Sequence, residues 1–141
     1  GQAGERFAVR NSGVTVVVEG CGSNGCEYMT GGTAVILGNV GANFGAGMTG
    51  GMAFVHDPEG SFQFEVNPDN VIYQRVETRH WGAVLKALVE EHAKETHSRF
   101  AEQLLVNWER ELERFWQVVP KEMLDKLDHP IKREEEQAKR A

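Results

Sequence analysis

The sequence predicts a mainly β protein: a right-handed parallel β-helix with about 19 residues per coil, followed by a C-terminal helical segment. Three observations predict this fold class. The tetrapeptide Met-Thr-Gly-Gly occurs at 29–32 and again at 48–51, two columns of glycine share the same 19-residue spacing, and a glycine-poor region with helical periodicity follows. A fixed period of this length is typical of solenoids, in which each repeat packs on its neighbours.

The glycine columns are the first element of the pattern. One column contains Gly13, Gly32 and Gly51, and the other contains Gly22, Gly41 and Gly60. We expect all six to be structural turn glycines at the corners of the coils, where the backbone needs a positive φ and a Cβ would clash with the next coil. The next step of the first column falls on Asn70, the residue that tolerates left-handed backbone best after glycine.

An apolar, β-rich run follows each step of the first column. These runs are 14–18, 33–37, 52–55 and 71–73. Superposing them by the period predicts one ladder of Val16, Val35, Phe54 and Tyr73 and a second ladder of Val17, Ile36, Val55 and Gln74. Adjacent residues of a strand point to opposite faces, yet both ladders are apolar over three coils, so one face must be covered from outside. The sequence leaves open which face points inward.

The helical segment begins after residue 77. Apolar residues at helical spacing predict one helix from about 79 to 94 and a second from about 98 to 117 that ends before Pro120. The second helix carries an apolar stripe of Phe100, Leu104, Leu105, Trp108, Leu112, Phe115 and Val119. We interpret its aromatic residues as core. The predicted division is therefore β-helical coils at 1–77, a two-helix cap at 78–127 and a charged flexible tail at 128–141.

Composition excludes several classes of function. The formal net charge is −6 and no dense Lys/Arg cluster occurs, which argues against nucleic-acid and anionic-membrane surfaces. No apolar run is long enough to cross a bilayer, and the N-terminus has no signal-peptide pattern. We therefore expect a cytoplasmic protein. Because the chain starts without Met, inside a repeat, we expect it to be part of something longer.

Two motifs invite a ligand site and are rejected. The segment 20–25 matches G-x-G-x-x-G, but it lies between two predicted strands, whereas a dinucleotide site requires a helix after the loop. Cys21 and Cys26 form a lone C-x4-C without the further ligands that zinc requires, so we interpret them as reduced thiols. No basic residue is adjacent to lower their pKa.

The remaining titratable residues define no catalytic group. The histidines are scattered without metal-ligand spacing: His56, His80, His92, His97 and His129. Glu27 and Glu65 lie near turns without an identifiable acidic partner, and no nucleophile arrangement occurs. The sequence therefore predicts no catalytic, cofactor-binding or metal-binding residue.

Long strings of this sequence resemble a known family. The segments 4–13, 18–20, 25–32 and 43–51, with Asn107-Trp108 and 115–120 in the tail, closely resemble the C-terminal domain of the glutamate synthase large (α) subunit, called the GXGXG domain. The resemblance covers essentially the whole chain and implies a parallel β-helix. One departure is His97, where a small residue such as glycine is expected, and it affects only the local turn.

The resemblance implies a structural role. The parent enzyme makes two glutamates from glutamine, 2-oxoglutarate and reductant, using an amidotransferase domain and a barrel with FMN and an iron–sulfur cluster. None of those motifs is present here, so the resemblance implies a scaffold without cofactor or catalysis. Its partners would be the remaining large-subunit domains and the small (β) subunit. The alternative is a free-standing assembly or interaction module, because the same β-helix resembles a formylmethanofuran dehydrogenase subunit.

Overall fold

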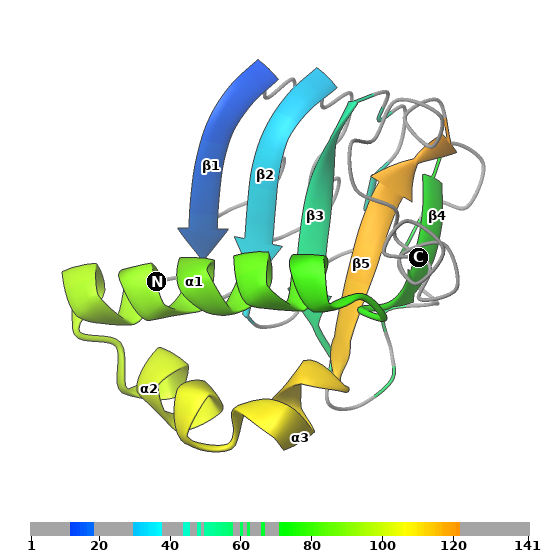
Figure 1. Cartoon of the computed structure of the whole chain (residues 1–141). Helices are drawn as coiled ribbons and strands as arrows, with labels where there is room; N and C mark the ends of the chain where they lie inside the picture. Colours follow the sequence, from blue (N-terminus) through cyan, green and yellow to red (C-terminus); the bar gives the residue numbers. More distant parts are fainter. Residues whose placement is uncertain are drawn as a thin grey trace.

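The chain forms one mixed β-sheet with helices against one of its faces (Figure 1). The computed structural model describes residues 12–18, 30–37, 44, 45, 48, 50–57, 60, 62, 66 and 71–121. Its elements are β1 (Ser12–Val18), β2 (Thr30–Ile36), β3 (Gly50–His56), β4 (Val71–Arg75), α1 (Arg79–Thr96), α2 (Arg99–Val106), α3 (Trp108–Leu112) and β5 (Phe115–Pro120). The four predicted strands are therefore present, and a fifth follows the helices.

The order of the strands differs from the predicted stack. The sheet has five strands in the order β1-β2-β3-β5-β4. β1, β2 and β3 are parallel, whereas β5 runs antiparallel to both of its neighbours, β3 and β4. The expected direct pairing of Phe54 with Tyr73 is therefore wrong, because β5 occupies the edge of β3 that β4 was predicted to take.

The registers of the parallel strands follow the repeat only in part. Between β2 and β3, Val35 pairs with Phe54 and Ile36 with Val55, as the 19-residue period predicts. Between β1 and β2, Val16 pairs with Ala34 instead of the predicted Val35. The cause is an irregularity between Ser12 and Thr15, which shortens the separation by one residue.

Two glycines of the first column have left-handed backbone inside strands. Gly32 has φ 81° and Gly51 has φ 80°, and both lie where the pairing between β2 and β3 is irregular. Two residues of β2 stand opposite one residue of β3 there, the arrangement of a β-bulge. Gly60 also has a positive φ, of 76°, and Gly13 lies in β1. Gly22 and Gly41 lie outside the described residues, and the turn role of the six glycines stays a prediction.

The backbone at Gly32 makes this position sensitive to substitution. We expect Gly32→Val to lower the free energy of unfolding by about 2 kcal/mol, because a β-branched side chain is strained at positive φ. Urea unfolding of the chain measures the loss. Thr33→Val, one residue further along β2, is the matched control and should change stability by less than about 0.5 kcal/mol. A loss below about 1 kcal/mol for Gly32→Val would contradict the proposed strain.

Both faces of the sheet are buried, as the two apolar ladders require. The cluster that we call the loop-side core contains Ala34, Ile36, Phe44, Met48, Ala53, Val55, Phe62, Val66, Val71 and Val118. The cluster that we call the helix-side core contains Val35, Leu37, Met52, Phe54, Leu85, Val89, Ala93, Ala101, Leu104, Phe115 and Val119. The ladder of Val35 and Phe54 therefore faces the helices, while Ile36 and Val55 face the other way.

The first predicted helix matches α1, and the second is shorter than predicted. α1 begins after Thr78, whose hydroxyl accepts a hydrogen bond from the Trp81 N–H at 3.3 Å. The expected second helix is interrupted at Asn107, between α2 and α3, and α3 ends at Leu112. Residues 115–120 then form β5 instead of a last helical turn. Their aromatic and β-branched side chains favour a strand, and alternate residues of that strand fill the two cores.

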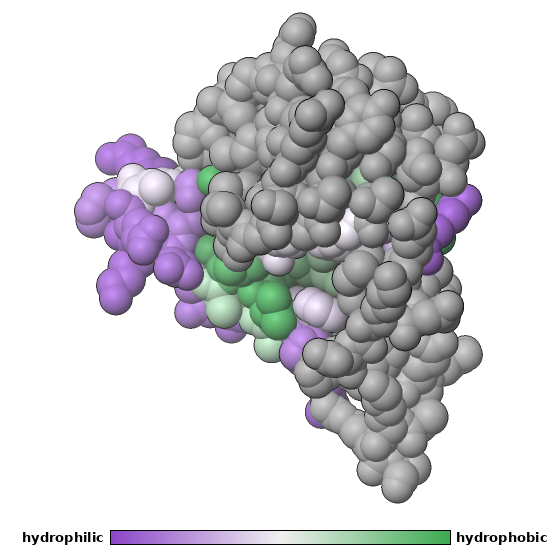
Figure 2. Space-filling model, turned by 90° about the horizontal axis from the view of Figure 1, so that it is seen from above, coloured by the Kyte–Doolittle hydropathy of each residue, from purple (hydrophilic) through white to green (hydrophobic). Residues whose placement is uncertain are grey.

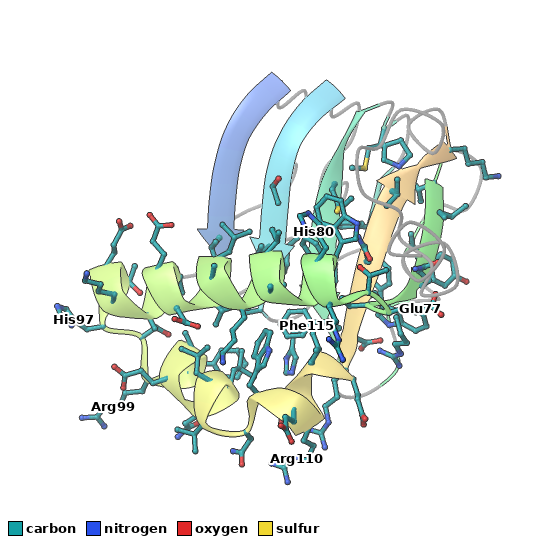
Figure 3. The ribbon with its side chains drawn as sticks, in the orientation of Figure 1. Glu77, His80, His97, Arg99, Arg110 and Phe115 are labelled. Carbon is teal, nitrogen blue, oxygen red and sulfur yellow. The ribbon has the colours of Figure 1, made fainter. Side chains whose placement is uncertain are left out.

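The turn between α1 and α2 contains His97, where the resemblance predicts a small residue. His97 ends α1 with φ 54° and ψ 36°, a left-handed conformation that favours glycine. Its side chain points away from the helices (Figure 3). We expect His97→Gly to raise the free energy of unfolding by about 1 kcal/mol, since it removes the Cβ strain and no buried contact. Thermal unfolding checks the sign, with His97→Ala expected to give no gain.

Candidate functional site

Polar side chains gather where β3 ends and β5 begins. His56 and Asp57 close β3, Glu111 comes from α3, and Arg114 and Trp116 come from the junction of α3 with β5. We call these five residues the polar latch. Residues that are more than fifty positions apart meet there, so the latch ties the C-terminal helices and β5 to the parallel strands.

A buried histidine–carboxylate pair forms the centre of the latch. His56 Nε2 donates to Glu111 Oε2 at 2.8 Å, and the two residues are only 5% and 7% exposed. Arg114 Nη1 donates to the other carboxylate oxygen, Oε1, at 3.4 Å. The His56 ring also packs against Phe115, with 5.0 Å between the ring centroids. A buried carboxylate needs hydrogen-bond donors such as these, because an unpaired charge in the protein interior costs free energy of folding.

Asp57 supplies the second half of the latch. Its Oδ2 accepts hydrogen bonds from the Phe62 backbone N–H at 2.9 Å and from the Trp116 indole Nε1 at 3.0 Å. Its own backbone N–H donates to the Arg114 carbonyl oxygen at 2.9 Å. Arg75 of β4 lies over the Trp116 ring, with its guanidinium carbon 3.9 Å from the centroid. Burial lowers the pKa of Arg75, and the charge of Asp57 acts in the opposite direction. One carboxylate thus joins β3, β5 and a loop.

The histidine–carboxylate pair of the latch is shielded from solvent. A histidine next to a carboxylate is a familiar general base, but a base must reach the proton that it removes from a substrate. The His56 side chain is 4% exposed and that of Glu111 is 9% exposed, so a substrate has no access to them in this structure. Within the part of the chain that the structure describes, no three His, Cys, Asp or Glu residues are placed to hold a metal ion.

The surface of the helices carries a depression without convergent ligand groups. It measures about 410 Å³ and is lined by six consecutive residues at the junction of α2 and α3, Leu105, Val106, Asn107, Trp108, Glu109 and Arg110. It is open to solvent, and ligand pockets are typically enclosed clefts with polar groups from several elements. No helix among the described residues has the length and apolarity needed to cross a bilayer.

The structure does not bring the sequence-derived candidates together. His80 stacks edge-on against Trp81 near the start of α1, and His92 is buried in α1. Only His56 belongs to the latch. The rejected loop 20–25 with its two cysteines, and Glu27, Glu65 and His129, lie outside the described residues.

Sequence reasoning missed the latch because its partners are distant in the chain. The sequence shows His56 only as one of several scattered histidines, and Glu111 as one of several acidic residues in a helical segment. No spacing rule connects a strand end with a helix more than fifty residues later. Trp116 was expected to be core, and it is only partly buried, with its indole N–H directed to Asp57.

The architecture defines a class of protein before any comparison: a sheet domain with a hydrophobic core on each face and a cluster of polar contacts at the end of β3. Residues 1–121 match the model of the family described as GXGXG motif, so the chain belongs to the GXGXG motif family. This finding, together with the relatives below, confirms the resemblance to glutamate synthase large chains.

Three relatives illustrate the similarity. The chain is 67% identical over 131 residues to the glutamate synthase [NADPH] large chain of Azospirillum brasilense, which covers 93% of this chain and 9% of the relative. It is 49% identical over 122 residues to the glutamate synthase [NADPH] large chain of Bacillus subtilis, and the match covers 86% of this chain and 8% of the relative. It is 53% identical over 120 residues to the ferredoxin-dependent glutamate synthase of Pyropia yezoensis, and the match covers 85% of this chain and 8% of the relative. The chain thus spans less than a tenth of the length of these relatives.

Proposed function

We propose that this chain is a non-catalytic structural domain of a glutamate synthase large chain. In this role it packs against the amidotransferase and FMN-barrel domains and holds them in position. The observation that carries the proposal is the 67% identity to a glutamate synthase large chain in a segment whose histidine–carboxylate pair is buried away from substrate. The reaction of the whole protein would be the conversion of glutamine, 2-oxoglutarate and reductant into two glutamates, in the cytoplasm.

The cofactors of that reaction belong to other parts of the protein in this proposal. Protein iron–sulfur clusters are held mainly by cysteine thiolates, four in the common [2Fe–2S] and [4Fe–4S] clusters, and this chain has two cysteines in all. The described residues contain no metal-ligand group either. We assign FMN and the cluster to the barrel domain, and we infer contacts with the remaining large-chain domains and with the small subunit.

We further propose that the parallel strands are coils of a right-handed β-helix. The register of β2 with β3 follows the 19-residue period, which supports stacked coils. Phe44 and Val66 form a parallel bridge outside the named strands, and both belong to the loop-side core. A second layer of parallel pairing on that face is what a coil interior requires. We therefore infer that the loop-side core is the inside of the coils and that the helices cover their outside.

The surface of the domain offers an apolar area for packing. On the face shown in Figure 2, hydrophobic side chains gather in one region near the middle, and hydrophilic side chains lie toward the edge. Among the described residues, the large hydrophobic side chains that are exposed are Phe100, at 38%, and Val106, at 82%, and both belong to α2. This arrangement supports a domain whose contacts are made by apolar surface.

Deletion of the segment tests the scaffold function. Glutamine-dependent glutamate formation is measured in the large chain without residues 1–141, with and without the segment added in trans. We expect activity, or its coupling to glutamine hydrolysis, to fall and to be restored by the added chain. A Phe115→Ala segment is the matched control, since loss of its fold should weaken the rescue. Unchanged activity after deletion would refute the scaffold and favour the alternative of an interaction module.

A further inference from the structure

The parallel stack of strands is interrupted by β5. Since β3 and β4 are both antiparallel to β5, they are parallel to each other, at a distance of two strand spacings, or about 9.6 Å. β4 is also the fourth copy of the repeat, because Tyr73 follows Phe54 by one 19-residue period. The strand that the repeat places beside β3 thus lies one position further out.

The insertion of β5 also changes which of the two cores each face of β4 contacts. Across β5, Ala53, Val118 and Tyr73 form one row, so Tyr73 packs against the loop-side core. In the repeat register Tyr73 would pair with Phe54, whose side chain lies in the helix-side core. The two registers differ by one residue, and a shift of one residue turns every side chain of a strand to the opposite face. The position of β5 therefore decides the orientation of β4.

Contacts other than strand pairing hold β5 in place. The polar latch holds Trp116 of β5 at the end of β3 through its hydrogen bond to Asp57, and the pair of His56 with Glu111 ties the preceding helix, α3, to β3. In the middle of β5, Gln117 is fully buried, and its Nε2 donates to the Met52 sulfur at 3.1 Å. Gln117 is the register partner of Phe54 in β3 and of Gln74 in β4. β5 runs antiparallel to both strands and follows no glycine of the 19-residue column, so it is not a copy of the repeat.

We propose that β5 is a terminating strand: it occupies the edge of β3 that the fourth repeat would otherwise take, and when β5 is displaced β4 pairs with β3 in the 19-residue register. The chain therefore holds two strands that compete for one edge, and the polar latch selects β5. Displacement leaves the edge of β3 unpaired, and an unpaired edge favours pairing with any available strand of matching pattern. This inference concerns the chain itself and does not depend on the proposed scaffold function.

Disulfide trapping in the full-length protein distinguishes the two pairings. Ala53→Cys with Val118→Cys reports the pairing of β3 with β5, since the two are Cα partners and antiparallel partners lie within disulfide range. Phe54→Cys with Tyr73→Cys reports the pairing of β3 with β4. Across an intervening strand its Cα separation exceeds the roughly 7 Å limit for a disulfide. Mass spectrometry of tryptic peptides identifies each bond and separates it from native cysteines.

Two variants weaken β5 and one serves as the control. Val118→Pro removes a ladder N–H from β5, and Glu111→Gln weakens the latch while keeping the size of the side chain. Glu113→Gln makes the same change as Glu111→Gln at an exposed residue outside the latch. Under mild oxidation we expect the 54–73 disulfide to form about tenfold faster with Glu111→Gln than with Glu113→Gln, because trapping accumulates even a rarely opened state. Val118→Pro should increase the rate further.

The outcomes decide the proposal in either direction. Two results together support the proposal. In the protein without a weakening substitution, the 53–118 disulfide forms rapidly and the 54–73 disulfide forms slowly. In a weakened variant, the 54–73 disulfide forms faster. If Val118→Pro does not fold, Glu111→Gln decides alone. A folded weakened variant with no increase in 54–73 bonding overturns the proposal, and so does a 54–73 disulfide that forms as fast as the 53–118 disulfide in the parent protein.

Discussion

Phe115→Ala should lower the free energy of unfolding by about 3–5 kcal/mol, the range for a fully buried phenylalanine. Phe115 is completely buried at the point where α3 passes into β5. Its ring lies between α1 and the layer of α2 and α3 (Figure 3), 5.0 Å from the His56 ring and 5.8 Å from the Trp108 ring. The substitution leaves a cavity that β3, α3 and β5 cannot close together, since the polar latch fixes their spacing.

Urea unfolding of the chain measures this loss. Phe100→Ala is the matched control, because Phe100 is 38% exposed on α2 and its removal should cost only about 1 kcal/mol. If the two substitutions destabilise equally, Phe115 does not hold the junction. In that case the helix-side core would not be centred on this residue.

Glu111→Ala is expected to lower the free energy of unfolding by about 3 kcal/mol, because it leaves the buried His56 side chain without its partner. Arg114 loses its carboxylate partner in the same change. The loss comes from leaving polar groups buried and unpaired. The attraction within a buried pair is itself largely offset by the cost of removing both groups from water. Glu111→Gln keeps an acceptor for the imidazole N–H and should cost about half as much.

Glu113→Ala serves as the control for this prediction. Glu113 is exposed and lies two residues further along, so its removal should change stability by less than about 0.5 kcal/mol. Chemical denaturation followed by tryptophan fluorescence measures all three variants. Equal stabilities of Glu111→Ala and Glu113→Ala would show that the buried pair does not hold α3 to β3.

The strands were predictable from sequence because their signal is local and repeated. The apolar runs within β1, β2 and β3 follow glycines at a fixed period, and the pairing of Val35 with Phe54 repeats that period. The order of the strands was not predictable in this way. Similar sequence shows which strands are alike, but not which strands are neighbours, and the edge of β3 is taken by the unrelated segment 115–120.

β5 was missed because a short apolar run fits two kinds of structure. Phe115 and Val119 are four residues apart, which continues the helical spacing of the preceding apolar residues. The predicted apolar stripe of the second helix therefore includes both of them. The break at Asn107 already shortens the helix, and Phe-Trp-Gln-Val-Val then alternates between the two faces of the sheet. For the candidate site, the pairing of His56 with Glu111 has no local signal, because it exists only after β3 and α3 have met.

The central position of β5 sets an order of events during synthesis of the chain. β4 contacts the sheet through β5, so the ribosome completes β4 and three helices before the strand that receives β4 exists. β1, β2 and β3 can pair as they emerge, and β4 reaches its final place beside β5 only after residues 115–120 are translated. Closing the sheet therefore requires a contact between distant parts of the chain and is its slow step. A nascent chain stalled before residue 115 lacks β5, and β4 in the 19-residue register then competes with strands of other chains for the open edge of β3.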